Sequence, residues 1–196
     1  MNLQTIYHAI SPHFRRARML EFARRFEISA GTRILDVGGT RANWALVPVC
    51  PKVICLNLDL KHAEVVANGC CLPFRSKQFD IVFSNSVIEH VPNSVKQRDF
   101  ADEIRRVGRR YYVQTPDYWF PIEPHLLAPF VHWLPERWRH HLVPWTPAAL
   151  MQPRLTPSLR EVHLLQAKQV QALFPDAELW FERFCGLSKS LIAVRL

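Results

Sequence analysis

The sequence predicts an α/β fold built on a doubly wound, mostly parallel sheet. Apolar runs rich in β-branched residues recur through the first 116 residues, and they are continuous rather than alternating. Continuous apolar runs are typical of strands covered on both faces, as in a parallel sheet. A helical segment separates two of these runs, and the chain ends in two runs joined by four residues, "CGLS".

The first element that we predict is a helix over residues 13–27. Met19, Phe22, Ala23 and Phe26 recur at the spacing of one helical face, and a cluster of arginines lies on the other side. We expect these arginines to be mostly solvated. Residues 1–30 thus form a helical cap that precedes the first strand.

The strands of the parallel part are predicted from the apolar runs at 33–37, 53–58, 64–67, 80–85 and 110–114. Only "LKHA" separates the second run from the third, and this is too short for a crossover helix of about a dozen residues. We therefore expect the usual second crossover helix to be missing. The run at 64–67 becomes a short edge strand whose direction the sequence leaves open.

A helix is predicted between the fourth and fifth strands, within "NSVKQRDFADEIRRVG". Phe100, Ile104 and Val107 share one face, and Ser94 with Gln97 fits a capping box. Strand, helix and strand in this order indicate doubly wound topology.

The last two runs, "AELWFERF" and "KSLIAVRL", are too close for a helical crossover. We expect an antiparallel terminal hairpin. With 196 residues, the chain fits one domain spanning 1–196, in which 117–157 is an insert.

The composition favours a soluble globular protein with an anionic partner. The chain is 48% hydrophobic and 21% charged, with a net charge of +8, which suits nucleic acid, a phospholipid surface or a phosphorylated substrate. No run is long enough to span a membrane, and the first residues lack a signal-peptide core. We expect a cytoplasmic protein, with a peripheral place at the inner membrane face as the further expectation. The five cysteines are predicted to be reduced and mostly buried.

The stretch "ILDVGGTRANW", residues 34–44, indicates a buried strand that stops at Asp36 and turns on Gly38 and Gly39. Such a turn offers backbone N–H groups and room for a ligand close to the main chain. Asp59 follows Asp36 by 23 residues, which suits an acid that accepts ribose hydroxyls. The alternative is a tight turn without a ligand.

These motifs, followed by "NGCCLPFRSKQFDIVFSNSVIEHV", resemble the class I S-adenosylmethionine-dependent methyltransferases, of the ubiquinone-type kind. The resemblance extends over roughly residues 30–116 and implies S-adenosylmethionine as the cofactor. By position, Asp36 and Gly38 would line its methionine end, Asp59 the ribose, and Asn68 with Gly69 the adenine edge, while Leu72 would pack on the base. The implied cofactor-binding set is Asp36, Gly38, Gly39, Thr40, Asp59, Asn68, Gly69, Leu72, Ser84 and Asn85. Thr40 and Ala42 depart from the glycines that the family often has.

The catalytic residues that we predict are His90, Glu89 and His125. His90 follows the fourth strand, where the transferred methyl should lie, and a histidine can take the proton of a hydroxyl acceptor. The alternative is that Glu89 and His90 only fix the following helix. Related enzymes have Glu-x-x-Glu-His here and bind a hard cation. This chain has Ser86 in the first position, and although Glu123 and His125 offer further ligand atoms, we assign no metal.

The segment 118–147 holds four of the six tryptophans, four of the nine histidines and six prolines. The prolines predict short helices broken by turns. Because ligands bind at the carboxyl ends of parallel strands, where this insert begins, we expect an acceptor lid. A satellite core, an interface on anionic lipid and base stacking on single-stranded nucleic acid are the alternatives.

The sequence therefore predicts an S-adenosylmethionine-dependent methyltransferase with a small or lipid-linked acceptor, methylated at oxygen. The alternatives are an RNA 2′-O-methyltransferase, which the charge supports, and an inactive cofactor-binding protein, which Thr40 and Ala42 support. Peripheral contact with an anionic membrane is an expected partner contact. Nucleic acid ranks below it, and no obligate protein partner is indicated.

Overall fold

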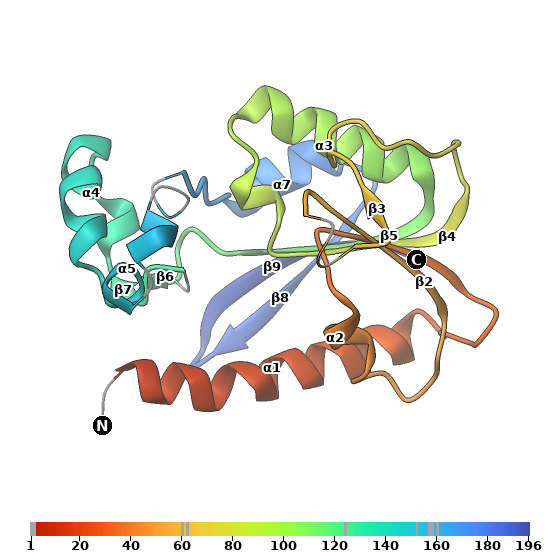
Figure 1. Cartoon of the computed structure of the whole chain (residues 1–196), viewed down its shortest axis with the longest axis horizontal. Helices are drawn as coiled ribbons and strands as arrows, with labels where there is room; N and C mark the ends of the chain where they lie inside the picture. The colour runs from red at the N-terminus through yellow and green to blue at the C-terminus, as the bar shows by residue number, and fades with distance from the viewer. Residues whose placement is uncertain are drawn as a thin grey trace.

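The computed structural model describes residues 3–59, 61, 63–123, 125–151, 153–156, 159 and 161–196. Within this part of the chain, seven strands form one sheet in the order β3-β2-β1-β4-β5-β9-β8 (Figure 1). The strands are β1 (Arg33–Val37), β2 (Lys52–Asn57), β3 (Val65–Val66), β4 (Phe79–Asn85), β5 (Gly108–Pro116), β8 (Glu178–Phe184) and β9 (Leu187–Arg195). The first five are parallel, whereas β9 runs antiparallel to both β5 and β8. The predicted α/β class and the antiparallel terminal pair are confirmed.

The strand order places a switch point between β1 and β4. From β1 the chain moves outward through β2 to β3, and then returns to build β4 and β5 on the other side of β1. Asp36 therefore lies between Cys55 of β2 and Phe83 of β4. In open α/β sheets, the crevice at the carboxyl ends of the strands beside such a reversal is where ligands bind.

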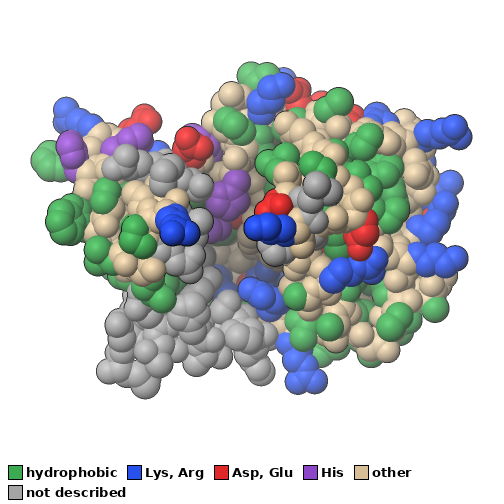
Figure 2. Space-filling view, in the orientation of Figure 1, with side chains coloured by type: hydrophobic (Ala, Val, Ile, Leu, Met, Phe, Trp, Pro, Cys, Tyr) green, Lys and Arg blue, Asp and Glu red, His purple; other side chains and the backbone are tan. Residues whose placement is uncertain are grey.

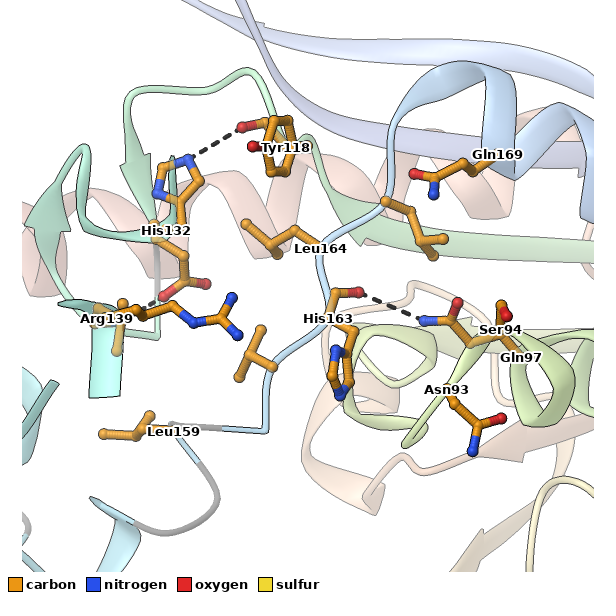
Figure 3. A pocket seen from close by; sticks show the side chains of 14 residues that line it. Asn93, Ser94, Gln97, Tyr118, His132, Arg139, Leu159, His163, Leu164 and Gln169 are labelled. Atoms are coloured by element: carbon orange, nitrogen blue, oxygen red, sulfur yellow. Dashed lines mark hydrogen bonds between the residues drawn. The ribbon is translucent and has the colours of Figure 1, made fainter. Parts of the chain in front are cut away.

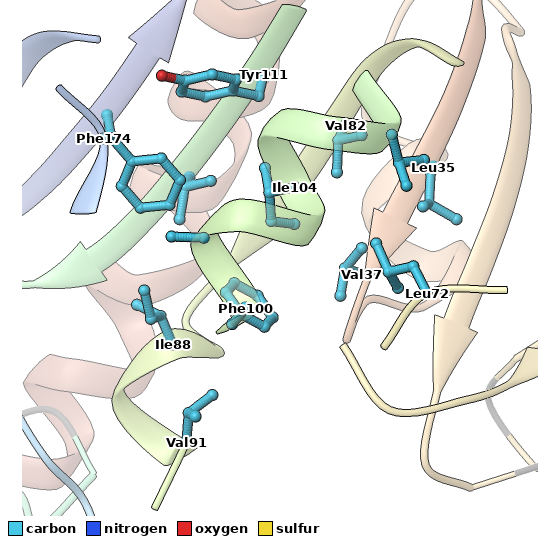
Figure 4. Packing of buried hydrophobic residues seen from close by; sticks show 14 of the residues in the cluster. Leu35, Val37, Leu72, Val82, Ile88, Val91, Phe100, Ile104, Tyr111 and Phe174 are labelled. Atoms are coloured by element: carbon cyan, nitrogen blue, oxygen red, sulfur yellow. The ribbon is translucent and has the colours of Figure 1, made fainter. Parts of the chain in front are cut away.

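Helices cover both faces of the sheet, as Figure 1 shows. On one face lies α1 (Leu3–Arg25), whose Met19 and Phe22, with Phe26 directly after the helix, are buried in one cluster with Phe83 and Tyr112. This confirms the apolar face predicted for residues 13–27. The other face is covered by α3 (Ser94–Val107) and α7 (Ala167–Leu173), and Figure 4 shows this core, with Phe100 and Ile104 packed over the sheet.

The connection between β2 and β3 contains no helix in the residues that are described there, as predicted. After β1 the chain forms only the four-residue α2 (Arg41–Trp44). The edge strand β3 pairs parallel with β2, through Leu56 and Val65 among others, so the structure decides the direction that the sequence left open.

The predicted capping box at the start of α3 is wrong. The helix is capped one residue earlier by Asn93, whose side chain accepts a hydrogen bond from the Lys96 N–H at 3.0 Å. The Gln97 amide instead donates to the Ile88 carbonyl at 3.2 Å, across the η1 turn (Ile88–His90). The Gln97 side chain, which the local pattern assigned to the cap, therefore makes a tertiary contact with the preceding loop instead.

The insert after β5 forms a separate lobe of short elements, at the left of Figure 1. They are β6 (Ile122–Glu123), β7 (Ala128–Pro129), η2 (Val131–Trp133), α4 (Glu136–Leu142), η3 (Val143–Trp145), α5 (Pro147–Met151) and η4 (Pro153–Leu155). The prediction of short helices broken by turns is confirmed. The lobe has its own small core, and the chain returns to the sheet where Leu165 pairs with Asp117.

Two further predictions concern surface and burial. The thiols are free, but Cys50, Cys71 and Cys185 are exposed and only Cys55 is buried, so the expectation of mostly buried cysteines is wrong. Exposure follows from their position in turns and loops at strand ends. Among the described helices, none has the length and apolar character needed to cross a bilayer.

Candidate functional site

The turn after β1 is shaped by contacts that only glycine allows. Gly38 has a φ of +78°, and its N–H donates to the Leu56 carbonyl at 2.7 Å. A Cβ at this position would lie 2.4 Å from a methyl carbon of Val87, which follows β4. Gly38 is therefore required both by its backbone conformation and by the close approach of the loop after the neighbouring strand.

Gly39 closes over the carboxylate of Asp36. A Cβ at residue 39 would lie about 2 Å from the Asp36 carboxyl atoms. The Asp36 side chain is fully buried, accepts a hydrogen bond from the Trp44 indole N–H at 2.8 Å, and keeps one oxygen, Oδ1, without a hydrogen-bond partner among the described atoms. Burial raises the pKa of Asp36 to about 7, against the effect of the Trp44 hydrogen bond.

The predicted ribose and adenine residues lie along the ends of β2 and β3. Asp59 is exposed two residues after β2, and its Oδ1 accepts the Lys61 N–H at 3.0 Å. Asn68 is exposed beyond β3 and caps its own turn by accepting the Cys70 N–H at 2.9 Å. Gly69 lies against Phe100, where a Cβ would approach the ring to 2.7 Å.

Leu72 differs from these neighbours because its side chain belongs to the core. Only 4% of the residue is exposed, and Figure 4 shows it beside Val37 in the buried core. Its backbone N–H is held by Glu103 of α3 at 2.6 Å. Sequence position alone does not distinguish this inward side chain from one that faces a ligand.

The remaining cofactor candidates lie at the ends of β1 and β4. Ser84 is buried and donates to the Val37 carbonyl at 3.2 Å, which ties the two strands together. Asn85 receives a hydrogen bond from Arg18 of α1. Thr40 is the half-buried N-cap residue of α2, and its side chain makes no capping hydrogen bond.

The three predicted catalytic residues come together although 35 residues separate His90 from His125. The two Nε2 atoms are 3.2 Å apart, with the rings nearly perpendicular. Glu89 Oε1 lies 3.9 Å from His125 Nε2, and Glu89 Oε2 accepts a hydrogen bond from Thr115 at 3.0 Å. The η1 turn positions the first pair, and the loop between β6 and β7 carries His125 to meet them.

Glu123 completes this group, and we refer to Glu89, His90, Glu123 and His125 as the Glu–His cluster. The Oε1 atom of Glu123 is 2.6 Å from His125 Nδ1, and its Oε2 accepts the Leu126 N–H at 2.5 Å. A carboxylate that accepts from Nδ1 places the proton there and leaves a lone pair on Nε2. The His125 ring is thus oriented by a buried carboxylate toward His90.

The cluster combines opposite electrostatic effects. Burial raises the pKa of Glu89 to about 7, while burial and the neighbouring His125 lower the pKa of His90 to about 4. Burial opposes a charge on His125, but the hydrogen bond and charge of Glu123, with Glu89, outweigh it and raise the pKa. His125 is therefore the histidine of the cluster that the surroundings favour in the protonated form.

The facing atoms of Glu89, His90 and His125 lie within 4.8 Å of one another, a spacing that one metal ion can span. Ser86, where the hard-cation pattern has a second carboxylate, donates its hydroxyl to Gln114 at 2.9 Å. The group as it stands contains what acid–base chemistry needs: an oriented imidazole and two carboxylates.

A polar cavity of about 110 Å³ opens beside the cluster. It lies between α1 and the ends of β4 and β5, and His125, Ser86, Arg18 and Lys189 are among its lining residues. Sequence reasoning missed this wall, because it grouped Arg18 with solvated arginines, whereas the Arg18 side chain is only 12% exposed. Arg18 precedes the apolar Phe22 by four residues, which places both on one helical face, and this spacing could have indicated that Arg18 faces the sheet.

A second cavity of about 260 Å³ lies between the insert lobe and the start of α3 (Figure 3). Tyr118, His132 and Arg139 line it from the insert, while the N-cap residue Asn93 and Gln97 line it at the start of α3. The segment 162–165 also lines it, and the His163 N–H in this segment donates to the Glu89 carbonyl at 2.7 Å. This cavity therefore touches the back of the Glu–His cluster.

The tryptophans of the insert do not fill its core. Trp138 is 55% exposed, Trp145 74% and Trp119 61%, whereas the buried hydrophobic cluster of the lobe consists of Leu126, Ala128, Val143, Ala149 and Leu159. Trp133 is 37% exposed and donates its indole N–H to the Tyr118 carbonyl at 2.8 Å. Figure 2 shows hydrophobic and histidine side chains gathered on this lobe. The alternative that the aromatics form a satellite core is thus wrong for Trp119, Trp138 and Trp145, because more than half of each of these residues faces solvent.

Comparison with known proteins gives a consistent result. Residues 33–110 match the family model of a methyltransferase domain. No curated protein has a sequence that matches this chain. The matched residues run from β1 through α3 into β5 and include the glycine turn, Asp59 and the first half of the Glu–His cluster.

Solved structures share the fold at low sequence identity. A possible exported protein of Bordetella parapertussis aligns with a TM-score of 0.58 and 14% identity over 92% of this chain and 67% of that one. An S-adenosylmethionine-dependent methyltransferase of Aquifex aeolicus gives 0.52 and 13% over 99% and 97%. Phosphoethanolamine N-methyltransferase 2 of Haemonchus contortus, in complex with S-adenosyl-L-methionine, gives 0.54 and 18% over 84% and 38%.

Proposed function

We propose that this chain, a class I S-adenosylmethionine-dependent methyltransferase, transfers its methyl group to an oxygen atom of a small or lipid-linked acceptor. The enzyme class and the cofactor follow from the methyltransferase domain and the fold. The acceptor and the methylated atom are the proposal. The observation that carries it is the Glu–His cluster beside the 110 Å³ cavity.

The glycine turn and the strand ends around it suit the cofactor. The cofactor carries a cationic ammonium group, and the buried Asp36 has one carboxylate oxygen without a hydrogen-bond partner among the described atoms below the turn. Asp59 offers a solvent-facing carboxylate for ribose hydroxyls. We assign Gly38, Gly39 and Thr40 to the turn, Asn68 and Gly69 to the adenine edge, and Ser84 and Asn85 to the methyl-transfer end.

Methyl transfer needs an aligned nucleophile more than it needs charge stabilisation. S-adenosylmethionine supplies an electrophilic methyl group on a sulfonium, and the chain's task is to hold an acceptor atom in line with it. A neutral amine attacks without help, whereas a hydroxyl must lose its proton. A half-buried histidine that Glu123 orients next to the cavity is therefore the feature that favours an oxygen acceptor.

Within the cluster, we propose His125 as the group that takes the acceptor's proton. It lines the cavity, and Glu123 holds its Nδ1–H so that the basic lone pair is on Nε2. This Nε2 faces the Nε2 of His90 at 3.2 Å, so the acceptor hydroxyl must displace His90 from it before its proton is taken. Glu89 and Glu123 stabilise the imidazolium that forms, and Glu123 is a positioning residue.

The insert is proposed as the part that meets the acceptor. Its lobe adjoins the Glu–His cluster through His125, and its exposed tryptophans lie next to arginine, as in Arg137 beside Trp138. Exposed indole rings with neighbouring cations suit the interface of an anionic bilayer. A lipid-linked acceptor, with peripheral contact at a membrane, is thus the form of the proposal that the insert supports.

The test is to find the product. The protein is incubated with S-adenosylmethionine that carries an isotopically labelled methyl group, together with separate aqueous and lipid extracts. The expected result is a labelled product in the lipid extract, with the label on oxygen by fragmentation. His125→Ala should abolish the label while cofactor affinity stays within about two-fold, because the histidine acts on the acceptor.

Each of the other results points elsewhere. A label on nitrogen would overturn the assignment of oxygen. A labelled ribose in added RNA, with binding that weakens steeply with salt, would favour the RNA alternative. Cofactor binding without a labelled product in any extract would favour an inactive binding protein.

A further inference from the structure

Arg18 and Lys189, two half-buried cations that line the 110 Å³ cavity, share the carboxylate of Glu182, which lies behind the lining. Arg18 donates to Glu182 through Nε at 3.0 Å and Nη2 at 2.7 Å, and Lys189 Nζ lies 3.7 Å from the same carboxylate. The side chains of Arg18, Lys189 and Glu182 are only 12%, 13% and 15% exposed. Their formal charges leave one positive charge in excess in this partly buried group.

No described residue that lines this cavity is acidic. Arg15 adds a further cation at its exposed rim, one helical turn before Arg18. A positive charge that is removed from water without a counter-charge is costly, and a ligand of opposite charge removes that cost. The excess positive charge around the cavity therefore favours the binding of an anion.

Arg18 and Lys189 differ in how tightly their present contacts hold the charged group. Arg18 uses its Nη1 on Asn85 and on Gln114, the latter at 3.1 Å, so its guanidinium is fixed between α1, β4 and β5. Lys189 contacts Glu182 only at 3.7 Å and lies 3.8 Å from the ring centroid of Phe14. Burial lowers the pKa of Lys189, and the charge of Glu182, which acts in the opposite direction and is itself opposed by Arg18, does not cancel this effect.

We propose that this cavity binds an anionic group of the acceptor, a phosphate or a carboxylate, through Lys189 and Arg15. Arg18 contributes its charge and holds the wall in place. The inference rests on the proposed function, because it names the class of acceptor. His125 lines the same cavity, so an anion seated against Lys189 brings the adjoining hydroxyl of the acceptor next to the proposed proton acceptor. Arg15 and Lys189 are then specificity determinants.

Binding is tested with the full chain, saturated with S-adenosylhomocysteine and titrated at constant ionic strength with inorganic phosphate and with acetate. Lys189→Met keeps the length of the side chain and removes its charge. We expect saturable binding of one anion per chain, weakened ten-fold or more in Lys189→Met and several-fold in Arg15→Ala. Arg16→Ala is the matched control, since Arg16 is exposed on the same helix and does not line the cavity, and its affinity should stay within about two-fold.

A second arm separates the sources of the anion. Dihexanoyl phosphatidic acid is titrated below the concentration at which it forms micelles. Tighter binding of this lipid than of inorganic phosphate, lost in Lys189→Met, supports a lipid headgroup as the anion. Equal affinity for the two phosphates supports a small soluble phosphate, and tighter binding of acetate supports a carboxylate.

The proposal is overturned if the anions bind without saturation, or if Lys189→Met and Arg16→Ala have the same affinity while both remain folded by thermal unfolding. Methyl transfer plays no part in this measurement. Lysine-dependent anion binding without any labelled product would therefore sink the proposed function and leave the anion site standing. A labelled product that carries no anionic group would do the opposite.

Discussion

Trp44 donates its indole N–H to the buried carboxylate of Asp36 at 2.8 Å, directly beneath the backbone of Gly39. The glycine turn thus encloses an acid of the chain itself before any ligand is considered. Burial favours the protonated form of this acid in the folded protein.

Asp36 is expected to make the cofactor-free protein less stable as the pH rises. Its pKa is about 7 when folded and near 3.8 when exposed, so the folded state binds the extra proton between these values. This contribution to stability is complete below about pH 4 and is lost as the pH passes 7, with about 1.4 kcal/mol for each pKa unit. The measurement is urea unfolding at pH 5 and pH 8.

The matched variant is Asp36→Asn, whose amide oxygen still accepts the Trp44 N–H. The fall in unfolding free energy between pH 5 and pH 8 should be smaller in the variant than in the wild type by a few kcal/mol. Identical pH dependence in both proteins would mean that Asp36 is ionised when folded. The variant should also bind S-adenosylmethionine more weakly.

Gly38→Ala should be far more destabilising than Gly186→Ala. The two glycines have nearly the same φ, +78° and +81°, but a Cβ would strike Val87 only at Gly38, and at Gly186 it would meet nothing within 4 Å. The conformational strain alone is about 1–2 kcal/mol, and the contact with Val87 adds to it. Comparison of the two unfolding free energies isolates that contact, and equal losses would refute it.

Asp59→Ala should weaken S-adenosylmethionine binding ten-fold or more, since hydrogen bonds to a charged group contribute about 1.5–3 kcal/mol each. Calorimetric titration measures it directly. Asp102→Ala serves as the control, because Asp102 is an exposed acid on α3 whose ion pair with Arg105 spans only one helical turn. An unchanged affinity in Asp59→Ala would exclude Asp59 from the site.

Trp138→Ala and Trp145→Ala should raise the acceptor's KM and leave the melting temperature within about one degree, because exposed side chains contribute little to folding. Leu126→Ala, in the buried core of the same lobe, should lower the melting temperature by several degrees, since such substitutions cost about 2–5 kcal/mol. Unchanged kinetics in both tryptophan variants would remove the insert from the acceptor site. Flotation with anionic vesicles, compared between wild type and these variants, tests the membrane contact.

Glu123→Gln should move the pH profile of methyl transfer. Glu123 raises the pKa of His125, and a base must be deprotonated to act, so activity of the wild type should rise with pH through a value above 6.5. Without the carboxylate the pKa falls and the rising limb shifts to lower pH, while the maximal rate drops because the ring loses its orientation. If the rising limb stays at the same pH and only the maximal rate falls, Glu123 has a structural role and does not set the pKa of His125.

The sequence by itself determined the sheet and its motifs, because those depend on local pattern. Continuous apolar runs define strands covered on both faces, "LKHA" leaves no room for a crossover helix, and "CGLS" forces an antiparallel return. The methyltransferase resemblance followed from the order of motifs within one contiguous stretch. Residue type and place in the chain also predicted His90, Glu89 and His125, which the structure brings together and whose catalytic role stays a prediction.

Only the tertiary structure decided what each side chain faces. The Leu72 side chain points into the core under α3, and Asp36 is buried beneath Gly39. The Gln97 side chain donates to the Ile88 carbonyl and does not cap the helix. The position of each residue in the sequence was as expected, but its surroundings were not. Arg18 and Lys189 belong to elements at opposite ends of the chain and meet at Glu182 because α1 packs across the sheet onto the terminal hairpin. Such groupings depend on contacts between distant segments, and the hydrophobic periodicity of one segment does not indicate which other segment packs against it.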